Sequence, residues 1–278
     1  MLIFALSILF FVLTIMLTGF MRHYALKKNI IDNPNERSSH SVPTPRGGGV
    51  AVVCSYLMAL AVLIYSQQLT VHIGLTIMAA GFVIALLGFL DDHGHINAML
   101  RLAIHFLVAI AVVISLGGFG SVAVFDGVQL GFLANIIAVL FLVWLLNLYN
   151  FMDGINGIAS VEAITVTASM ATLYYVLNIS LHSDVLWLLG ACVFGFLLWN
   201  FPKAKIFMGD SGSIILGMFI CILSIKLIEY PINNLTPFWQ KISKPVFVIS
   251  IISYPLLDTF RVVLIRTLNG QSPFLADK

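Results

Sequence analysis

Nine long apolar runs constrain the fold of this chain more than any other feature of its sequence. Each run holds 17 to 24 residues with at most two charges, and together they cover most of the 278 residues. A helix of about 20 apolar residues crosses a bilayer. The sequence therefore predicts an all-α polytopic membrane protein with about nine transmembrane helices, over residues 2–21, 47–65, 73–90, 102–119, 130–149, 158–181, 185–201, 212–228 and 245–265.

Composition supports a membrane protein and excludes several other classes. Only 9% of the residues are charged, whereas soluble domains carry about 25%. The three cysteines lie inside apolar runs, without the spacing of a disulfide framework or a zinc site. No soluble domain fits between the runs, so residues 1–278 are read as one integral-membrane domain in contact with the lipid bilayer. No nucleic-acid partner is expected.

The basic residues predict which side of the membrane each loop faces. Eleven of the 14 Lys and Arg residues follow the first, third, fifth, seventh and ninth runs or lie at their edges. Cytoplasmic loops are enriched in Lys and Arg. This predicts a cytoplasmic side for those segments and an outside N-terminus. Basic residues follow the first run instead of preceding it, so 2–21 is read as a retained helix and not as a signal peptide.

One loop on the predicted outer side has a strand pattern. In "SVAVFDGVQLG", over 121–131, apolar residues alternate around Asp126-Gly127. Asp-Gly between alternating apolar residues favours a two-residue hairpin turn. A short β-hairpin is expected there.

Carboxylates gather in or beside the cytoplasmic segments. They are Asp32, Asp91, Asp92, Asp153 and Asp210. Asp32, taken alone, is equally well explained as a solvated loop residue. The others lie in glycine-rich polar contexts where a span meets the cytoplasm, which favours a site over solvated charges.

Two motifs place amides, hydroxyls and glycines beside these acids. "NLYNFMDGING" spaces Asn147, Asn150 and Asp153 by three residues, which puts them on one helical face. "GDSGS" brackets Asp210 with Gly209 and Ser211 before an apolar run. A serine there is suited to cap the helix, whose free N–H groups favour phosphate.

Oxygen ligands of this kind suit Mg²⁺, which binds through one or two carboxylates together with substrate phosphates. The loop "DNPNERSSHSVPTPRGGG", over 32–49, adds Arg37 and Arg46, whose forked guanidinium groups match phosphate. Arg101 either binds a substrate phosphate or anchors its helix at the headgroups. Together these residues favour a site for a metal-bound phosphate compound.

The order of these motifs resembles a known family. "DNPNERSSHSVPTPRGGG", "GFLDDHGHINAMLRL", "NLYNFMDGINGIAS", "KIFMGDSGSIILG" and "YPLLDTFRVVLIRTLNGQSPFLADK" are similar, in this order, to motifs of the polyprenyl-phosphate N-acetylhexosamine-1-phosphate transferases. The resemblance covers nearly the whole chain. It is strongest to the bacterial branch that starts surface polysaccharides, such as O-antigen and lipopolysaccharide, at the inner (cytoplasmic) membrane.

The resemblance implies a reaction and its partners. Undecaprenyl phosphate would attack the sugar-linked phosphate of a UDP-N-acetylhexosamine, releasing UMP and leaving a lipid-diphosphate sugar. The implied cofactor is Mg²⁺, with Mn²⁺ as an alternative, and a homodimer is compatible with the sequence.

The resemblance also implies roles for particular residues. Asp210 would be the main metal ligand, with Asn147 or Asn150 nearby. Asp91 and Asp92 would handle the lipid phosphate or supply a base, and Asp153 would complete the catalytic acids. The implied substrate-binding residues are Asp32, Asn35, Arg37, Arg46, Arg101, Asn156, Gly209 and Ser211.

Two departures from the family pattern affect these expectations. Asn156 stands where the family has a second acid, so a base role at that position is in doubt while binding remains open. Members of the family continue into an H-x-H-H cluster and at least one further span. The sequence therefore predicts either a truncated form or impaired activity.

Two alternatives from other classes remain: an inactive scaffold, and a transporter or flippase of lipid-linked sugars. Transporters place their polar sites near the membrane midplane. Here the intramembrane polar residues are few and scattered, which favours the enzyme.

Overall fold

The computed structural model describes residues 2–34, 40–94, 96–118, 123–125, 128–129, 131–176 and 180–229. Eight helices and two small antiparallel sheets form within this described part. The helices are α1 (Leu2–Lys27), α2 (Gly49–Tyr65), α3 (Val71–His93), α4 (Ala98–Ser115), α5 (Phe132–Met152), α6 (Ile158–Val176), α7 (Ser180–Asn200) and α8 (Asp210–Glu229). The strands are β1 (Ile31–Asp32), β2 (Thr44–Pro45), β3 (Ala123–Phe125) and β4 (Val128–Gln129).

These helices confirm an all-α membrane protein. Within the described residues, α1, α3, α4, α5 and α7 are long and apolar enough to cross a membrane. Helices α2, α6 and α8 coincide with three more of the predicted runs. The ninth run, 245–265, lies outside the described residues, so the count of nine stays a prediction.

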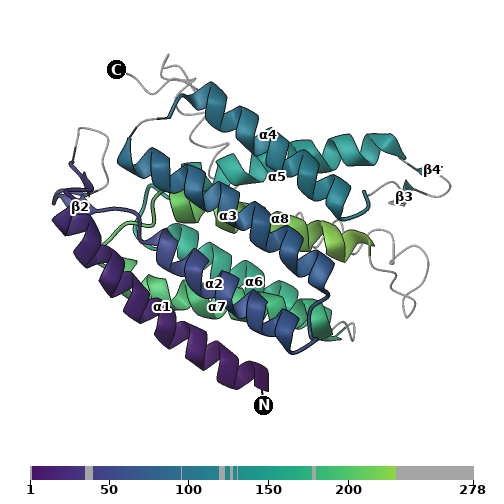
Figure 1. Ribbon diagram of the computed structural model, residues 1–278, viewed down its shortest axis with the longest axis horizontal. Coiled ribbons are helices and arrows are strands. Elements are labelled where there is room, and N and C mark those ends of the chain that lie inside the picture. Colours follow the sequence, from purple (N-terminus) through teal and green to yellow (C-terminus); the bar gives the residue numbers. More distant parts are fainter. Residues whose placement is uncertain are drawn as a thin grey trace.

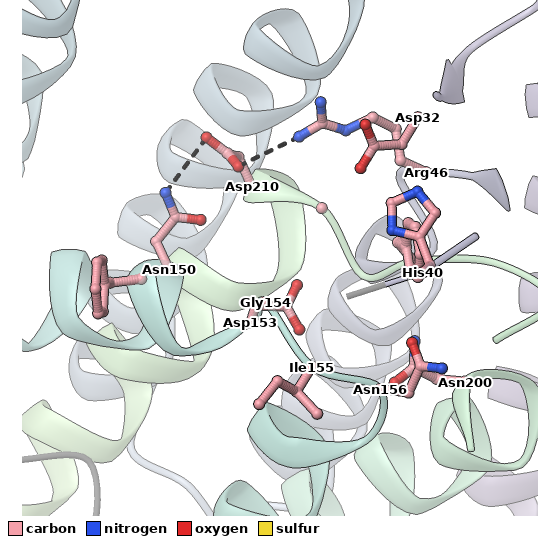
Figure 2. A pocket seen from close by; sticks show the side chains of 13 residues that line it. Asp32, His40, Arg46, Asn150, Asp153, Gly154, Ile155, Asn156, Asn200 and Asp210 are labelled. Atoms are coloured by element: carbon pink, nitrogen blue, oxygen red, sulfur yellow. Dashed lines mark hydrogen bonds and ion pairs between the residues drawn. The ribbon is translucent and has the colours of Figure 1, made fainter. Parts of the chain in front are cut away.

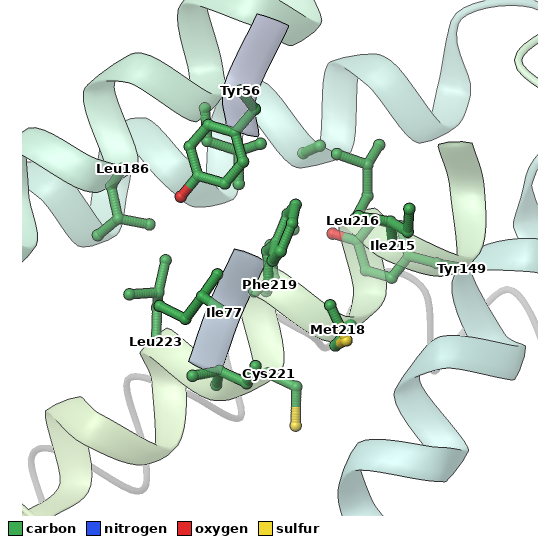
Figure 3. Close-up of a cluster of buried hydrophobic side chains, with 14 of the residues drawn as sticks. Tyr56, Ile77, Tyr149, Leu186, Ile215, Leu216, Met218, Phe219, Cys221 and Leu223 are labelled. Atoms are coloured by element: carbon green, nitrogen blue, oxygen red, sulfur yellow. The ribbon is translucent and has the colours of Figure 1, made fainter. Parts of the chain in front are cut away.

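Helix α8 forms the centre of the bundle. It contacts α2, α3, α5 and α6, and Figure 1 shows it between the α4–α5 pair and the helices α2, α6 and α7. Every residue from Ser211 to Ile225 is buried. A helix that is apolar on all sides is typical of a protein core or a membrane span, and here neighbouring helices surround it. The ring of Phe219 accordingly packs 4.8 Å, centroid to centroid, from that of Tyr56 in the core drawn in Figure 3.

Helix α1 lies at the edge of the bundle, against α7 and α2 (Figure 1). Its outward side exposes large apolar side chains, with Phe4 73%, Met16 67% and Phe20 66% exposed. A contiguous apolar surface of this kind indicates contact with lipid.

Some helix ends differ from the predicted runs. Helix α3 continues through Asp91 and Asp92 to His93, three residues beyond the apolar run. Helix α6 ends at Val176, five residues before the predicted end, and α7 begins at Ser180 instead of at residue 185. Apolar runs locate membrane spans, but the polar residues that follow can extend a helix when folding supplies partners for them.

The sequence predicted one of the two sheets, β3–β4, and gave no indication of the other, β1–β2. Strands β3 and β4 pair antiparallel, with Ala123 opposite Gln129, which confirms the predicted hairpin. Its turn, Asp126-Gly127, lies outside the described residues. Strands β1 and β2 also pair antiparallel, with Asp32 opposite Thr44, and no sequence signal predicted this pairing.

Candidate functional site

Four predicted acids meet at one end of the bundle. Asp91 and Asp92 occupy the last turn of α3, Asp153 follows the last residue of α5, and Asp210 is the first residue of α8. We call these four carboxylates, together with Arg46 and Arg101, the acidic cluster. The cluster exists because two helices end where a third begins.

A glycine lets α3 and α8 approach closely at this point. A Cβ atom on Gly88 would lie 2.5 Å from the backbone nitrogen of Ser211, a distance that real contacts do not reach. Only glycine therefore allows the end of α3 to touch the start of α8. This contact places Asp91 and Asp92 next to Asp210.

Asp92 is the most enclosed member of the cluster. Its side chain is 1% exposed, and its Oδ1 lies 3.1 Å from Nε of Arg46. The same carboxylate accepts the backbone N–H groups of Asp210 (3.3 Å) and Ser211 (3.5 Å). The first N–H groups of a helix lack partners within it and favour an anion. Asp92 therefore serves as a cap for α8, supplied by a different helix.

Arg46 reaches the cluster through a strand-like loop. The N–H of Phe207 donates to the carbonyl of Pro45 (2.8 Å), and the N–H of Gly48 donates to the carbonyl of Phe207 (2.9 Å). These bonds dock the end of β2 onto the segment before α8. Nη2 of Arg46 then lies 3.7 Å from Oδ1 of Asp210, as Figure 2 shows.

Arg101 forms the other two ion pairs of the cluster, with Asp91 and with Asp210. It lies on the first turn of α4, and Asn97 caps this helix by accepting the N–H of Met99 at 2.8 Å. Nη1 of Arg101 contacts Oδ2 of Asp91 and lies 2.9 Å from Oδ2 of Asp210. The headgroup-anchor reading of Arg101 is therefore less favoured than a role in the site.

The carboxylates of the cluster outnumber its arginines by four to two. Burial, followed by the carboxylates of Asp91 and Asp92, raises the pKa of Asp210 to about 6, although Arg101 and Arg46 oppose the shift. Burial and the same crowding by Asp210 and Asp92 raise the pKa of Asp153 well above its usual range. An added cation would relieve both effects.

A cavity of about 370 Å³ opens beside the cluster (Figure 2). Its polar lining includes Asp153 and Asp210 together with the amides of Asn150 and Asn156. The remaining lining residues are Asp32, His40, Arg46, Phe151, Gly154, Ile155, Asn200, Phe207 and Gly209. A polar cavity of this size admits a small phosphorylated ligand.

Amides hold the side of the cavity that lies away from the arginines. Asn200, only 3% exposed, accepts the N–H of Gly157 at 2.6 Å and donates to the carbonyl of Ile206 at 3.1 Å. Asn156 donates to the carbonyl of Pro202 at 3.4 Å. These bonds join the loop after α5 to the loop after α7, and we call them the amide clasp.

The other predicted site residues differ in whether they contact the acidic cluster, line the cavity or lie outside the described residues. Asn150 donates to Asp210 at 3.5 Å and accepts the hydroxyl of Ser213 at 2.8 Å, whereas Asn147 contacts His105 on α4 and does not line the cavity. Ser211 is buried, and its N–H faces Asp92. Asn35 and Arg37 lie outside the described residues.

Sequence reasoning missed three residues of the site. Asn200 is a lone amide at the end of an apolar run, and nothing local distinguishes it from a polar boundary residue. Phe207 lines the cavity and packs edge-on against His40 with ring centroids 4.8 Å apart. Ser213, the last residue of "GDSGS", donates its hydroxyl to the oxygen of Asn150 and so orients that amide.

The donor set suits a hard cation that also binds substrate. Among the described residues, no group of three acidic, histidine or cysteine side chains is close enough to form a complete metal site. Mg²⁺ does not require one, because it retains waters and takes ligands from phosphates. The carboxylate of Asp210 and the amide of Asn150 both line the cavity, where the amide donates its NH₂ group to Asp210 and its oxygen accepts from Ser213. One carboxylate at a cavity that admits phosphates is compatible with Mg²⁺.

These features define a multi-pass helical membrane protein with a phosphate-compatible acidic site where its helices end. The comparison with known families agrees, because the glycosyl transferase family 4 profile matches residues 73–228. The chain belongs to this family, which confirms its resemblance to the polyprenyl-phosphate N-acetylhexosamine-1-phosphate transferases, and it is therefore a transferase.

Three similar proteins cover nearly the whole chain. The probable undecaprenyl-phosphate N-acetylglucosaminyl 1-phosphate transferase of Bacillus subtilis is 30% identical, over 95% of this chain and 72% of its own length. The decaprenyl-phosphate N-acetylglucosaminephosphotransferase of Mycolicibacterium smegmatis is 30% identical, over 96% and 71%. The undecaprenyl-phosphate alpha-N-acetylglucosaminyl 1-phosphate transferase of Escherichia coli is 28% identical, over 96% and 72%.

Proposed function

We propose that this protein transfers N-acetylhexosamine-1-phosphate from a UDP-sugar to undecaprenyl phosphate, releasing UMP. The names of its relatives favour N-acetylglucosamine as the sugar. The product would be a lipid-diphosphate sugar that starts a cell-surface polysaccharide such as O-antigen.

The observation that carries this proposal is the acidic cluster beside the cavity. Both substrates are anionic, so they need cations at the reacting phosphates. Arg46 and Arg101 supply two, and the excess of carboxylates attracts a third. The alternative is that these acids are ordinary solvated loop charges. Solvated charges are not buried and are not bridged by arginines from other segments of the chain, as these carboxylates are.

Asp210 and Asn150 would hold Mg²⁺, with Mn²⁺ as an alternative. The metal would neutralise the leaving diphosphate and orient it for attack. Asn147 contacts His105 and would support this arrangement from α5 without being a ligand itself.

The chemistry assigns a separate task to each part of the cluster. An oxygen of the lipid phosphate attacks the sugar-linked phosphorus, and the bond between the two phosphates of the UDP-sugar breaks with its electron pair leaving on UMP. Of the adjacent aspartates, Asp91 would receive the lipid phosphate and any proton it carries, while Asp92 contacts Arg46 and the start of α8. Asp153, Asn156, Gly209 and Asp32 line the cavity that would hold the nucleotide sugar.

We further propose that this end of the bundle faces the bacterial cytoplasm. The excess of Lys and Arg in the loops at this end supports that orientation. A cysteine introduced next to the N-terminus should then react with a membrane-impermeant thiol reagent on intact spheroplasts, and one at Lys203 should react only after lysis. The reverse pattern would reject the orientation.

The test of the reaction uses the purified chain in detergent with undecaprenyl phosphate, UDP-N-acetylglucosamine and Mg²⁺. Release of UMP together with formation of the lipid-diphosphate sugar would support the proposal. Uptake of a labelled sugar into proteoliposomes without UMP release would support a transporter and contradict it. UDP-N-acetylgalactosamine, assayed in parallel, would decide which sugar is preferred.

A further inference from the structure

We propose that Asp92 is a positioning residue that caps α8 and holds Asp210 in place, while Asp91 alone of the adjacent pair faces the substrates. This inference deepens the proposed transfer reaction, and its activity measurements rest on that reaction. The sequence does not distinguish the two adjacent aspartates, but the structure gives them different exposure and different hydrogen-bond partners.

Asp92 has no free capacity to meet a substrate. Its side chain is 1% exposed, against 12% for that of Asp91, although neither of the two lines the cavity. One oxygen faces Arg46 and the N–H of Asp210, and the other faces the N–H of Ser211. Both oxygens of this carboxylate are therefore engaged by donors, which come from two different segments of the chain.

The backbone before α8 is shaped around the same carboxylate. Gly209 has φ +75°, and a Cβ atom on it would lie 2.6 Å from Oδ2 of Asp92. A side chain at position 209 would push the carboxylate away from the helix start. The turn that delivers Asp210 therefore requires a glycine both for its backbone angle and to admit Asp92.

Asp91 lies in a more open environment. Its side chain is 12% exposed, it accepts the N–H of Ile96 at 2.7 Å, and its second oxygen contacts Arg101. Arg101 is itself 26% exposed and belongs to a different helix. Its contact with this oxygen of Asp91 can therefore be replaced by a contact with substrate. A substrate phosphate that takes Arg101 would leave Asp91 beside it.

The two roles respond differently to an amide. A cap needs an acceptor oxygen, which asparagine supplies, whereas a proton acceptor needs a carboxylate. In Asp92→Asn, Oδ1 can still accept from Arg46 and Asp210. The new NH₂ group replaces the oxygen that accepts the N–H of Ser211, so this longer bond is lost, but the group can donate to the buried hydroxyl of Ser211. In Asp91→Asn the basic group is lost and nothing replaces it.

The experiment compares Asp91→Asn, Asp92→Asn and Asp92→Ala in the full chain, by UMP release and by thermal unfolding in detergent without metal. We expect Asp92→Asn to keep turnover within about tenfold of the wild type, with an unchanged pH profile, because the cap persists. Asp91→Asn should lose about a hundredfold to a thousandfold in turnover at nearly unchanged unfolding temperature. Asp92→Ala should lose both turnover and thermal stability.

Two outcomes would overturn the inference. One is an Asp92→Asn variant as inactive as Asp91→Asn, since an amide would then not suffice at position 92. The other is an Asp92→Ala variant that unfolds at the wild-type temperature, since no cap would then have been removed. The unfolding measurement needs no substrate. It therefore tests Asp92 even if the wild type releases no UMP, a result that would reject the proposed reaction alone.

Discussion

The acidic cluster and the amide clasp hold opposite sides of the same cavity by different physical means. The cluster relies on ion pairs, in which Arg46 and Arg101 bridge carboxylates at the end of α3 and the start of α8. The clasp relies on neutral hydrogen bonds from Asn200 and Asn156 to loop backbone. Charged partners can be exchanged for substrate or metal, whereas the neutral bonds of the clasp are lost only when the loops separate. We call the side held by the acidic cluster the reactive side of the cavity, and the side held by the amide clasp the framing side.

Asp210→Asn should give the largest loss of activity, because the reactive side loses its central carboxylate. Turnover should fall by about a thousandfold, as expected when a metal ligand at the reacting phosphates is removed. The measurement is UMP release at saturating substrate. Asp184→Asn is the matched control, because Asp184 lies 16 residues before Asn200 on α7, roughly 24 Å along the helix axis. Equal activity of Asp210→Asn and wild type would contradict the assignment.

Arg101→Gln should separate metal binding from catalysis. Removing this guanidinium takes a positive charge away from Asp91 and Asp210, so Mn²⁺ should bind about tenfold more tightly. Turnover should nevertheless fall by about a hundredfold, because a phosphate contact is lost. Electron paramagnetic resonance of Mn²⁺ measures binding without turnover. Arg22→Gln is the control, since Arg22 donates to the carbonyl of Lys205 and is absent from the cluster. Weaker Mn²⁺ binding to Arg101→Gln would show that Arg101 supports the metal and does not compete with it.

Asn200→Leu tests whether the framing side also affects function. The change leaves the buried N–H of Gly157 and the carbonyl of Ile206 without partners, at a cost of about 2–4 kcal/mol of unfolding free energy. The loops that line the cavity should shift, which should raise KM for the nucleotide sugar by about tenfold with a smaller change in kcat. Asn156→Ala, which removes a single longer bond, should have a weaker effect in both measurements. A loss confined to kcat would place Asn200 on the reactive side.

The two sides also differ in how far the sequence predicts them. Apolar runs end just before Asp91 and Asp153 and begin just after Asp210, and the rule on basic loops places these three points on one side, so the acids of the cluster could be predicted to meet. The partners of each acid could not, because Arg46 depends on the β1–β2 pairing and on its docking against Phe207. The role of Asn200 could not be predicted, because its partners are backbone groups, which every residue type carries. Helix spacing also grouped Asn147 with Asn150, although only Asn150 contacts Asp210.

The last predicted effect concerns stability alone and follows from the raised pKa of Asp210. This carboxyl has a pKa of about 6 in the folded chain, against 3.8 as its ordinary value. Between these two values the folded state binds the proton more tightly than the unfolded state, so unfolding free energy falls as pH rises from about 4 to about 6. It stays lower above that range, by up to about 3 kcal/mol. Asp210→Asn lacks this penalty, so without metal it should unfold at a higher temperature than the wild type at pH 8 and at a similar temperature at pH 4. The difference should shrink when Mg²⁺ is added, because the metal stabilises the ionised carboxylate of the wild type only. A variant less stable than the wild type at pH 8 would mean that Arg46 and Arg101 outweigh the crowding of the acids, and the acidic cluster would then need no added cation.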